Sequence, residues 1–346
     1  MLVTALLFIP AAEIVLRVSC AYCTWTEKNE GVFVPPYAVN ESSWYHASDP
    51  NALLSYQLSE FDYEKRTNSL GLRDVEHPLP KRSGELRLVA VGDSFTEGWG
   101  ARFEQTWLNQ LGGMLNAGSG ASQLTMMCGG VAGSDPFYNY RMLVDKLLPY
   151  RPDFVLLVVN NTDVMDVIRR GGMERFQPDG TVQGVEPPPM PWLYESSHVA
   201  RLVLFEVFDY THLLITRAER EKRAQQALAK LMALVSEYNT VLELQGVDFM
   251  LVLVPHHNEL KRNRYDRIDA LKDYALKRQI DVIDTKPYLY SKLEQHEGRL
   301  ADLYWPVDMH FTELGYRYFA EAIEIGLGPK ISRARSGSPD TIPRSP

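Results

Sequence analysis

Five short apolar runs, separated by longer stretches of helix-forming composition, constrain the fold of this chain more than any other feature. The runs are continuous rather than alternating, and they cover residues 86–91, 126–131, 154–159, 249–254 and 281–283. Strands that are apolar on both faces are typical of parallel sheets covered on both sides. Helix-compatible stretches lie at 102–115, 137–148, 217–244, 265–278 and 313–325. This alternation predicts an α/β fold, a three-layer α/β/α doubly wound sheet of about five parallel strands.

The N-terminal 25 residues begin with an apolar run that ends at Ala12 and is followed by Glu13 and Arg17. The uncharged run is shorter than the ~20 residues that span a bilayer, and it lacks the positive start of a secretory signal. An amphipathic surface anchor is an alternative. We expect residues 1–25 to form an N-terminal membrane anchor or signal-like segment.

The remaining sequence divides by composition. We expect an irregular lead-in packed on the core at residues 26–85, the main domain at 86–330, and a disordered tail rich in Ser, Pro and Arg at 331–346. Within the main domain, residues 169–215 contain a proline run and interrupt the alternation, so they predict an insertion placed to cover a site.

Charge and cysteine content exclude several classes of function. The net charge of −8 and the lack of a dense Lys/Arg stripe argue against nucleic acid as a partner. The cysteines are Cys20, Cys23 and Cys128, too few for a disulfide framework. Cys20 and Cys23 have CxxC spacing without a second pair or a histidine set, so we expect two small apolar side chains rather than a redox or zinc site. No metal ion or other cofactor is expected.

The stretch VAVGDSFTEGWG, residues 89–100, combines a strand end with glycines, hydroxyls and carboxylates. Its spacing fits neither the GxxxxGK[ST] phosphate loop, nor GxGxxG, nor the GxSxG nucleophile turn. Ser94 stands just past a buried strand and before an expected helix, at the sheet edge where open α/β folds place ligands. The free N–H groups of a helix start can stabilise an oxyanion, so Ser94 is a candidate nucleophile.

A serine nucleophile needs a base, and His310 is the best candidate among eight histidines. It alone has a carboxylate, Asp308, two residues before it and an expected helix after it. Asp308 can hold one ring nitrogen while the other faces the nucleophile, which is the logic of a Ser-His-Asp triad.

These residues give the chain a resemblance to the SGNH (GDSL) hydrolase superfamily. The segment 92–98, Gly-Asp-Ser-Phe-Thr-Glu-Gly, is similar to its first block, and 308–310 resembles its fifth block, usually DxxH but here DxH. Blocks in the family's order run from residue 92 to 315. The resemblance implies a flavodoxin-like fold and a serine carboxylic ester hydrolase, with Ser94 as nucleophile, His310 as base and Asp308 orienting His310.

The resemblance also implies an oxyanion hole made by the N–H of Ser94, a block-two glycine N–H and a block-three asparagine side chain. Gly120 and Gly133 are candidates for the glycine; we choose Gly133, which follows a predicted strand and precedes a helix. Without gaps, Thr162 occupies the asparagine position. We choose Asn161 as the donor, with Asn160 and Thr162 as rivals.

Two further histidines, His256 and His257, follow the strand at 249–254. Neighbouring side chains at a strand end point in opposite directions, so a shared metal is unfavourable. A contact with substrate is the role left open for them.

The expected function is a serine esterase or acyl hydrolase acting on a small-molecule or glycan ester, such as O-acetyl groups of a cell-surface glycan. Alternatives are an O-acyltransferase to a glycan, a catalytically inactive binding protein with the same fold, and a lipid-directed enzyme using the apolar stretch 199–215. Alginate-type acetyltransferases also have a DxH pair, but it precedes their serine, so the order here favours hydrolysis. We expect membrane association through the N-terminus, with the catalytic domain facing the periplasm or the exterior.

Overall fold

The computed structural model describes residues 2–23, 27, 44, 46–117, 123–183, 191–207, 216–265 and 267–336. The chain forms two compact units. The sheet unit comprises His46–Asp163 and Lys230–Pro346, and the small unit comprises Met1–Tyr45 and Val164–Ala229.

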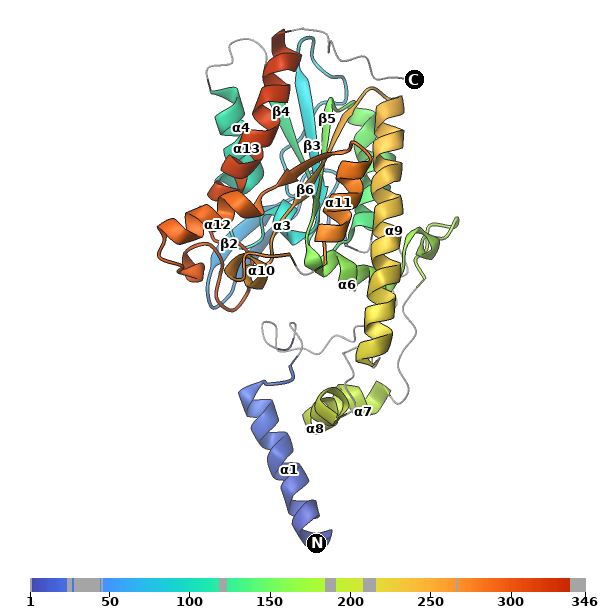
Figure 1. Cartoon of the computed structure of the whole chain (residues 1–346), viewed down its shortest axis with the longest axis vertical. Helices are drawn as coiled ribbons and strands as arrows, with labels where there is room; N and C mark the ends of the chain where they lie inside the picture. Colours follow the sequence, from blue (N-terminus) through green and yellow to red (C-terminus); the bar gives the residue numbers. More distant parts are fainter. Residues whose placement is uncertain are drawn as a thin grey trace. The chain divides into compact units, whose positions relative to one another are not determined.

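Five parallel strands form the centre of the sheet unit, in the order β4, β3, β5, β6, β7 (Figure 1). They are β3 (Leu86–Gly92), β4 (Leu124–Gly130), β5 (Phe154–Val159), β6 (Asp248–Leu253) and β7 (Asp281–Asp284). Because β3 pairs with both β4 and β5, the winding direction reverses beside β3. The carboxyl ends of the strands at such a reversal open the crevice in which ligands bind. The prediction of about five parallel strands is confirmed.

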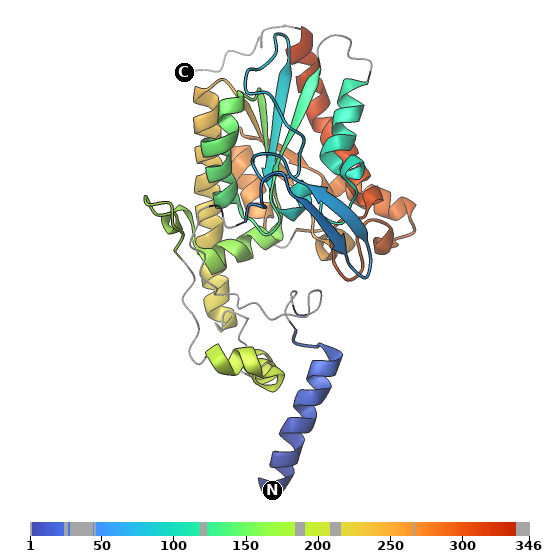
Figure 2. The same ribbon diagram turned by 180° about the vertical axis from the view of Figure 1, so that it is seen from behind.

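Helices cover both faces of this sheet (Figures 1 and 2). One face packs against α4 (Trp107–Asn116), α12 (Lys286–Gln295) and α13 (Glu313–Ser336). The other is covered by α5 (Pro136–Met142), α9 (Arg217–Leu244) and α11 (Asp269–Lys277). Successive strand side chains point to opposite faces, which explains why the strands are apolar throughout. The predicted three-layer α/β/α arrangement is confirmed.

The helix ends show where the sequence pattern was less informative. α9 has the predicted bounds, whereas the helix predicted at 265–278 begins only at Asp269. The helix predicted at 313–325 continues to Ser336, so the start of the tail predicted to be disordered is helical. Arg335 holds this last turn by donating to the Leu115 carbonyl at 2.6 Å. Residues 337–346 lie outside the described part.

A β-hairpin lies in the lead-in, where none was expected. Its antiparallel strands are β1 (Leu53–Gln57) and β2 (Asp62–Arg66). β2 alternates between exposed and buried residues, but one of the two buried side chains is Lys65, so the alternation is not a hydrophobic one. The prediction of an irregular lead-in is therefore wrong for this segment. Of residues 26–45, only 27 and 44 are described.

The small unit is mostly helical where it is described, with an isolated β-bridge between Phe176 and Val182. It contains α1 (Leu2–Ser19), most of α6 (Asn161–Arg170), α7 (Pro191–Ser196), α8 (His198–Leu202) and the first part of α9. No helix among the described residues is long and apolar enough to cross a membrane. The membrane anchor predicted for residues 1–25 gains no support from this finding.

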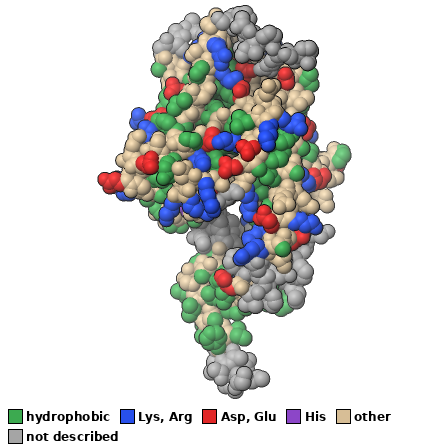
Figure 3. Space-filling model, viewed as in Figure 1, with side chains coloured by type: hydrophobic (Ala, Val, Ile, Leu, Met, Phe, Trp, Pro, Cys, Tyr) green, Lys and Arg blue, Asp and Glu red, His purple; other side chains and the backbone are tan. Residues whose placement is uncertain are grey.

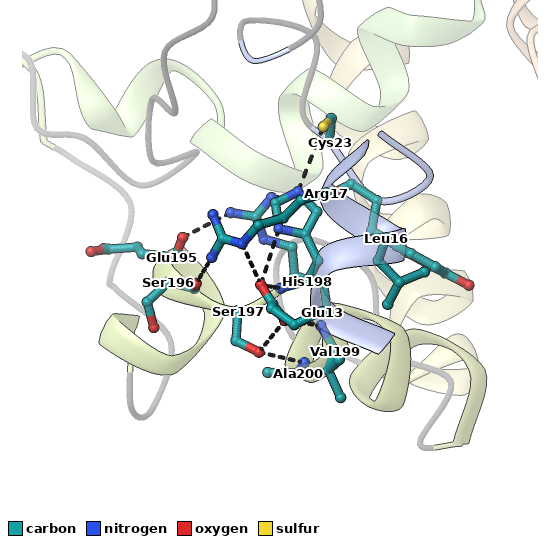
Figure 4. A network of polar contacts seen from close by, with 12 residues as sticks. Glu13, Leu16, Arg17, Cys23, Glu195, Ser196, Ser197, His198, Val199 and Ala200 are labelled. Atoms are coloured by element: carbon teal, nitrogen blue, oxygen red, sulfur yellow. Dashed lines mark hydrogen bonds and ion pairs between the residues drawn. The ribbon is translucent and has the colours of Figure 1, made fainter. Parts of the chain in front are cut away.

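The charged residues that interrupt the apolar N-terminal run hold α1 against α8 (Figure 4). Glu13 accepts hydrogen bonds from the Ser197 hydroxyl and from the backbone N–H groups of His198 and Val199, at 2.8–2.9 Å. Arg17 pairs with the same carboxylate at 2.7 Å. Burial alone would raise the pKa of Glu13, but these donors lower it to about 2. Glu13 is therefore a structural anion in the small unit.

The cysteines differ from the sequence-based expectation. Cys20 and Cys23 form a disulfide, whose CxxC spacing closes a single turn after α1. Cys128 is the free cysteine and is buried in β4. The expectation that Cys20 and Cys23 are merely small apolar side chains is wrong.

Candidate active site

Ser94 begins a one-turn helix at the carboxyl end of β3. This helix, α3, spans Ser94–Glu97, and Asp93 caps it by accepting a hydrogen bond from the Phe95 N–H at 3.0 Å. Gly98 ends it with a left-handed φ of 84°, a conformation that favours glycine. The cap is Asp93 rather than Ser94, so the serine hydroxyl is left for another partner.

That partner is His310, more than two hundred residues along the chain. Ser94 Oγ lies 2.7 Å from His310 Nε2, and His310 Nδ1 lies 2.6 Å from Asp308 Oδ1. Because a carboxylate can only accept, the Nδ1–H donates to Asp308 and Nε2 accepts from the serine hydroxyl. The structure thus brings the three predicted catalytic residues into one hydrogen-bonded chain.

The short DxH spacing is made possible by the backbone at Met309. Its φ of 71° is left-handed, which is uncommon for a residue with a side chain and turns the loop sharply between Asp308 and His310. The Trp305 N–H donates to the His310 carbonyl at 2.8 Å and closes the loop. One residue between acid and base is therefore enough here.

Asp308 is held as a buried carboxylate. Its side chain is only 4% exposed, and Oδ2 accepts from the Trp99 indole N–H at 3.3 Å. Burial alone would raise the pKa of Asp308, but the hydrogen bonds from His310 and Trp99 hold it below its ordinary value. The carboxyl is therefore charged at neutral pH and can stabilise an imidazolium at His310.

The residues after β5 differ in which side chains are already engaged. Asn160 is fully buried; its Nδ2 donates to Asp93 at 2.8 Å and its Oδ1 accepts from the Thr162 hydroxyl at 2.6 Å. Both rivals for the oxyanion donor are thus committed to structural bonds. Asn161 opens α6, and its Oδ1 is buried without a hydrogen-bond partner in the described part of the chain. These bonds to Asp93 and Asn160 do not involve the Asn161 side chain.

Asp93 links the segment after β5 to Ser94, the proposed nucleophile. Full burial raises the pKa of the Asp93 carboxyl, while the hydrogen bonds from Asn160 and Phe95 favour its charged form. The hydrogen bond from Asn160 to Asp93 therefore joins the loop after β5 to the residue that immediately precedes Ser94.

Gly133, the predicted second oxyanion donor, lies in the turn that follows β4. Its φ is 75° and the residue is exposed. The turn is tied to the strand end below Ser94, because the Val131 N–H and the Ser134 hydroxyl both donate to the Gly92 carbonyl, at 3.0 and 3.1 Å. The rival, Gly120, lies outside the described residues. The oxyanion roles of Ser94, Gly133 and Asn161 stay predictions.

The neighbouring histidines do not behave as expected. His256 and His257 face one another, with 3.0 Å between their Nδ1 atoms, instead of pointing apart as expected for neighbours at a strand end. The expectation fails because β6 has ended at Leu253 and the chain turns into α10 (His257–Lys261), which His256 caps. Burial lowers the pKa of His257.

One cluster among the described residues brings three possible metal ligands within 4.8 Å, namely Cys23, Glu27 and His198 in the small unit. Zinc binds cysteine as thiolate, but the Cys23 sulfur is bonded to Cys20. Glu27 is already paired with Arg201 at 2.8 Å. The disulfide form of this cluster therefore offers no complete ligand set.

Several residues that support the site were missed by sequence reasoning. They are Glu60, Lys65, Arg73, Glu97 and Trp99, all charged or aromatic and all near Ser94 or Asp308 through the contacts described below. Glu97 and Trp99 lie within the stretch 89–100, whereas Glu60, Lys65 and Arg73 lie in the lead-in, where no motif distinguished them.

At the carboxyl edge of a doubly wound sheet, a serine is hydrogen-bonded to an imidazole, which is hydrogen-bonded to a carboxylate. This arrangement defines a serine hydrolase. A family model described as the GDSL-like lipase/acylhydrolase family matches residues 90–318. The chain therefore belongs to this family, and the resemblance to the SGNH (GDSL) superfamily is confirmed. Its enzyme class is that of the serine carboxylic ester hydrolases.

Solved structures with a similar fold are distant in sequence. A two-domain esterase (CEX) active on acetylated mannans has 14% identity and a TM-score of 0.45; the match covers 72% of this chain and 50% of that one, so this chain spans half its length. The acetyl xylan esterase AlAXEase has 14% identity and a TM-score of 0.44, with 69% and 98% covered. A lipase/acylhydrolase from Enterococcus faecalis has 12% identity and a TM-score of 0.40, with 71% and 96% covered. The comparison with curated proteins finds no significant match.

Proposed function

We propose that this protein hydrolyses a carboxylic ester through an acyl-enzyme on Ser94. The observation behind the proposal is the hydrogen-bonded chain Ser94–His310–Asp308, with distances of 2.7 and 2.6 Å. Family membership supports ester hydrolysis in general; the roles of individual residues are part of the proposal.

In the first half-reaction, Ser94 Oγ attacks the carbonyl carbon while His310 Nε2 takes the hydroxyl proton. Asp308 holds the imidazole and stabilises its positive charge. The tetrahedral intermediate collapses, the C–O bond to the alcohol breaks, and His310 returns the proton to the leaving oxygen. Water then attacks the acyl-enzyme with His310 as base, which releases the acid and restores Ser94.

The N–H groups of Ser94 and Gly133 and the side-chain amide of Asn161 would stabilise the negative oxygen of each intermediate. Support comes from the turn at Gly133, whose neighbours Val131 and Ser134 donate to the Gly92 carbonyl, and from the bonds that engage Asn160 and Thr162 with other partners. This assignment extends the proposal and is tested separately below.

The first test compares wild type with Ser94→Ala on esters from acetyl to long acyl chains. We expect Ser94→Ala to lose about 1000-fold or more in kcat and to resist labelling by an active-site-directed organophosphonate, since both reactions need the nucleophile. Ser55→Ala, at an exposed serine on β1, is the matched control. Undiminished hydrolysis by Ser94→Ala would show that the mechanism is wrong, and an unlabelled wild type would favour an inactive binding protein.

For the substrate, we propose O-acetyl groups of a cell-surface glycan. This choice is supported by the expected location outside the cytoplasm, and the Cys20–Cys23 disulfide is consistent with an oxidising compartment. An acetylated glycan should release acetate in the presence of wild type and not of Ser94→Ala. Lower acetate release when an unacetylated acceptor glycan is added, with acetate appearing on that acceptor, would identify acyl transfer instead.

Membrane association through the N-terminus is the last part of this proposal. In the small unit, α1 exposes large apolar side chains, including Phe8 (72%), Val15 (64%) and Val18 (83%) (Figure 3). A helix that exposes such side chains and also carries Glu13 and Arg17 suits the interface of a bilayer rather than its interior.

Vesicle flotation tests this association. Wild type should float with phosphatidylcholine–phosphatidylglycerol vesicles, and the double variant Val15→Asp/Val18→Asp should float several-fold less. The control is Leu244→Asp, at an 83% exposed position on α9. Equal recovery of wild type and double variant would remove α1 as the binding surface.

A further inference from the structure

The turn of the β1–β2 hairpin reaches the loop that carries Asp308. The turn covers residues 58–61, closed by the Leu58 N–H donating to the Phe61 carbonyl at 3.0 Å. From it, the Glu60 carboxylate accepts the backbone N–H of Val307 at 2.9 Å and the backbone N–H of Asp308 at 2.8 Å. One carboxylate thus engages two successive peptide groups of the catalytic loop.

These contacts add to the loop's own hydrogen bonds, in which the Met309 N–H donates to the Trp305 carbonyl and the Trp305 N–H to the His310 carbonyl, both at 2.8 Å. Val307 is 61% exposed, and Met309 is in the left-handed region, a conformation that persists only when its surroundings impose it. Hydrogen bonds to an ionised acceptor are about twice as strong as neutral ones. Glu60 therefore supplies a strong restraint on the backbone of the residue that orients His310.

The second strand of the hairpin reaches another loop of the site. Lys65 pairs with Glu97 of α3 at 2.9 Å, with both side chains almost fully buried at 5% and 1% exposure. The other oxygen of Glu97 accepts the Ala132 N–H at 2.8 Å. Through this buried pair, the hairpin, the nucleophile helix and the turn containing Gly133 are joined.

The segment that follows the hairpin holds the turn after Ser94. Arg73 is 1% exposed and donates to the carbonyls of Gly98 at 2.7 Å and Ala101 at 2.6 Å. Its guanidinium lies 4.5 Å from the centre of the Tyr63 ring on β2. The lead-in thus contacts the Asp308 loop and the helix and turn that carry Ser94, and it reaches the turn containing Gly133 through Glu97.

An aromatic cluster completes this arrangement. Phe61, Tyr63 and Trp99 are buried together. The ring centre of Phe61 lies 5.3 Å from that of Trp305, at the start of the Asp308 loop. Since Trp99 also donates to Asp308, the hairpin packs against the indole ring that holds Oδ2 of the Asp308 carboxylate.

We infer that Glu60 is a positioning residue of the active site: by accepting the N–H groups of Val307 and Asp308 it holds Asp308 where its carboxylate meets His310 Nδ1. The inference rests on the proposed function for its catalytic readout. With this role for Glu60, the hairpin of the lead-in is part of the active site rather than only a covering of the core.

The test uses the full chain with Glu60→Ala and Glu60→Gln, and Glu64→Ala as control, because the Glu64 side chain is 62% exposed on the same hairpin. Glu60→Ala should lower kcat for a short acyl ester about tenfold to a hundredfold with KM nearly unchanged, since a small displacement of a catalytic group has effects of that size. Glu60→Gln keeps an acceptor oxygen and should lose less than about tenfold. Glu64→Ala should match wild type.

A double-mutant cycle separates positioning from general destabilisation. If Glu60 acts through Asp308, Glu60→Ala should have almost no further effect in an Asp308→Ala background. The rate of Ser94 phosphonylation serves as the readout, because it measures a single event and works for slow variants. Equal losses in both backgrounds, or a wild-type rate for Glu60→Ala, would overturn the inference.

Failure of the proposed function can be recognised independently. The His310 Nδ1–H donated to Asp308 should give a far-downfield proton NMR signal in wild type, which is assigned by its loss in Asp308→Ala. The signal should shift or vanish in Glu60→Ala and persist in Glu64→Ala. If wild type hydrolyses no ester but this pattern holds, only the activity is wrong; if the signal is the same in Glu60→Ala and wild type, the positioning role is wrong.

Discussion

At the scale of single residues, the hydrogen-bond partners of side chains distinguish residues that look equivalent in the sequence. Asn160, Asn161 and Thr162 follow one another after β5, and any of them could donate to an oxyanion. The structure engages Asn160 with Asp93 and engages Thr162 with Asn160. These bonds do not involve the Asn161 side chain, so the donor chosen from the sequence stays the best candidate.

The corresponding prediction concerns Asn161→Ala. Its kcat on a short acyl ester should fall about a hundredfold with little change in KM, because the amide acts on the charge that develops in the transition state. Thr162→Val is the control and should lose less than about fivefold, since its hydroxyl donates to Asn160 rather than to substrate. Steady-state kinetics on both variants test this prediction. A larger loss of kcat in Thr162→Val than in Asn161→Ala would make Thr162 the better candidate for the oxyanion donor.

At the scale of secondary-structure elements, polar side chains connect neighbouring strands at the ends remote from the site. Glu85 precedes β3 and accepts from Arg87 Nε and from the Thr125 hydroxyl of β4, both at 2.7 Å. Burial alone would raise the pKa of Glu85, but these donors and the Arg82 N–H lower it to about 2. The charged form of Glu85 is therefore favoured by folding.

This lowered pKa predicts how stability depends on pH. A carboxyl whose pKa is lower in the folded state stabilises fully above its unfolded value of 4.5 and loses that contribution as the pH falls towards about 2. Glu85→Gln should melt roughly 2–4 °C below wild type at pH 7, and the gap should narrow between pH 4.5 and 2.5. Glu297→Gln, at an 82% exposed side chain, is the control in thermal unfolding. If the difference in melting temperature between wild type and Glu85→Gln grew in acid, folding would not lower the pKa of Glu85.

The Asp308 loop shows the limit of prediction at this scale. The motif placed Asp308 and His310 near Ser94, and the structure does bring them together. The left-handed Met309 that makes the short spacing workable has no signal in the sequence, since methionine is not a residue that favours this conformation. Its geometry is imposed by the surrounding hydrogen bonds.

At the scale of the sheet unit, the site is assembled from parts distant in the chain. Ser94 follows β3, Asn161 follows β5, and the loop at 304–310 precedes α13. Parallel strands bring their carboxyl ends to one edge, and the reversal of winding beside β3 opens the crevice there. The sheet topology thus explains why residues 216 positions apart share a hydrogen bond.

The parallel sheet could be predicted from the sequence, because continuous apolar runs are what two-sided burial requires, and Ser94 and His310 could be predicted as partners from their local motifs. The contacts between the lead-in hairpin and the site could be seen only in the folded chain. Glu60 meets Val307 across 247 positions, and Lys65 and Arg73 are buried although their types suggest exposure. Such contacts depend on which surfaces the fold brings together, and buried charges with partners far along the chain leave no periodic pattern in the sequence.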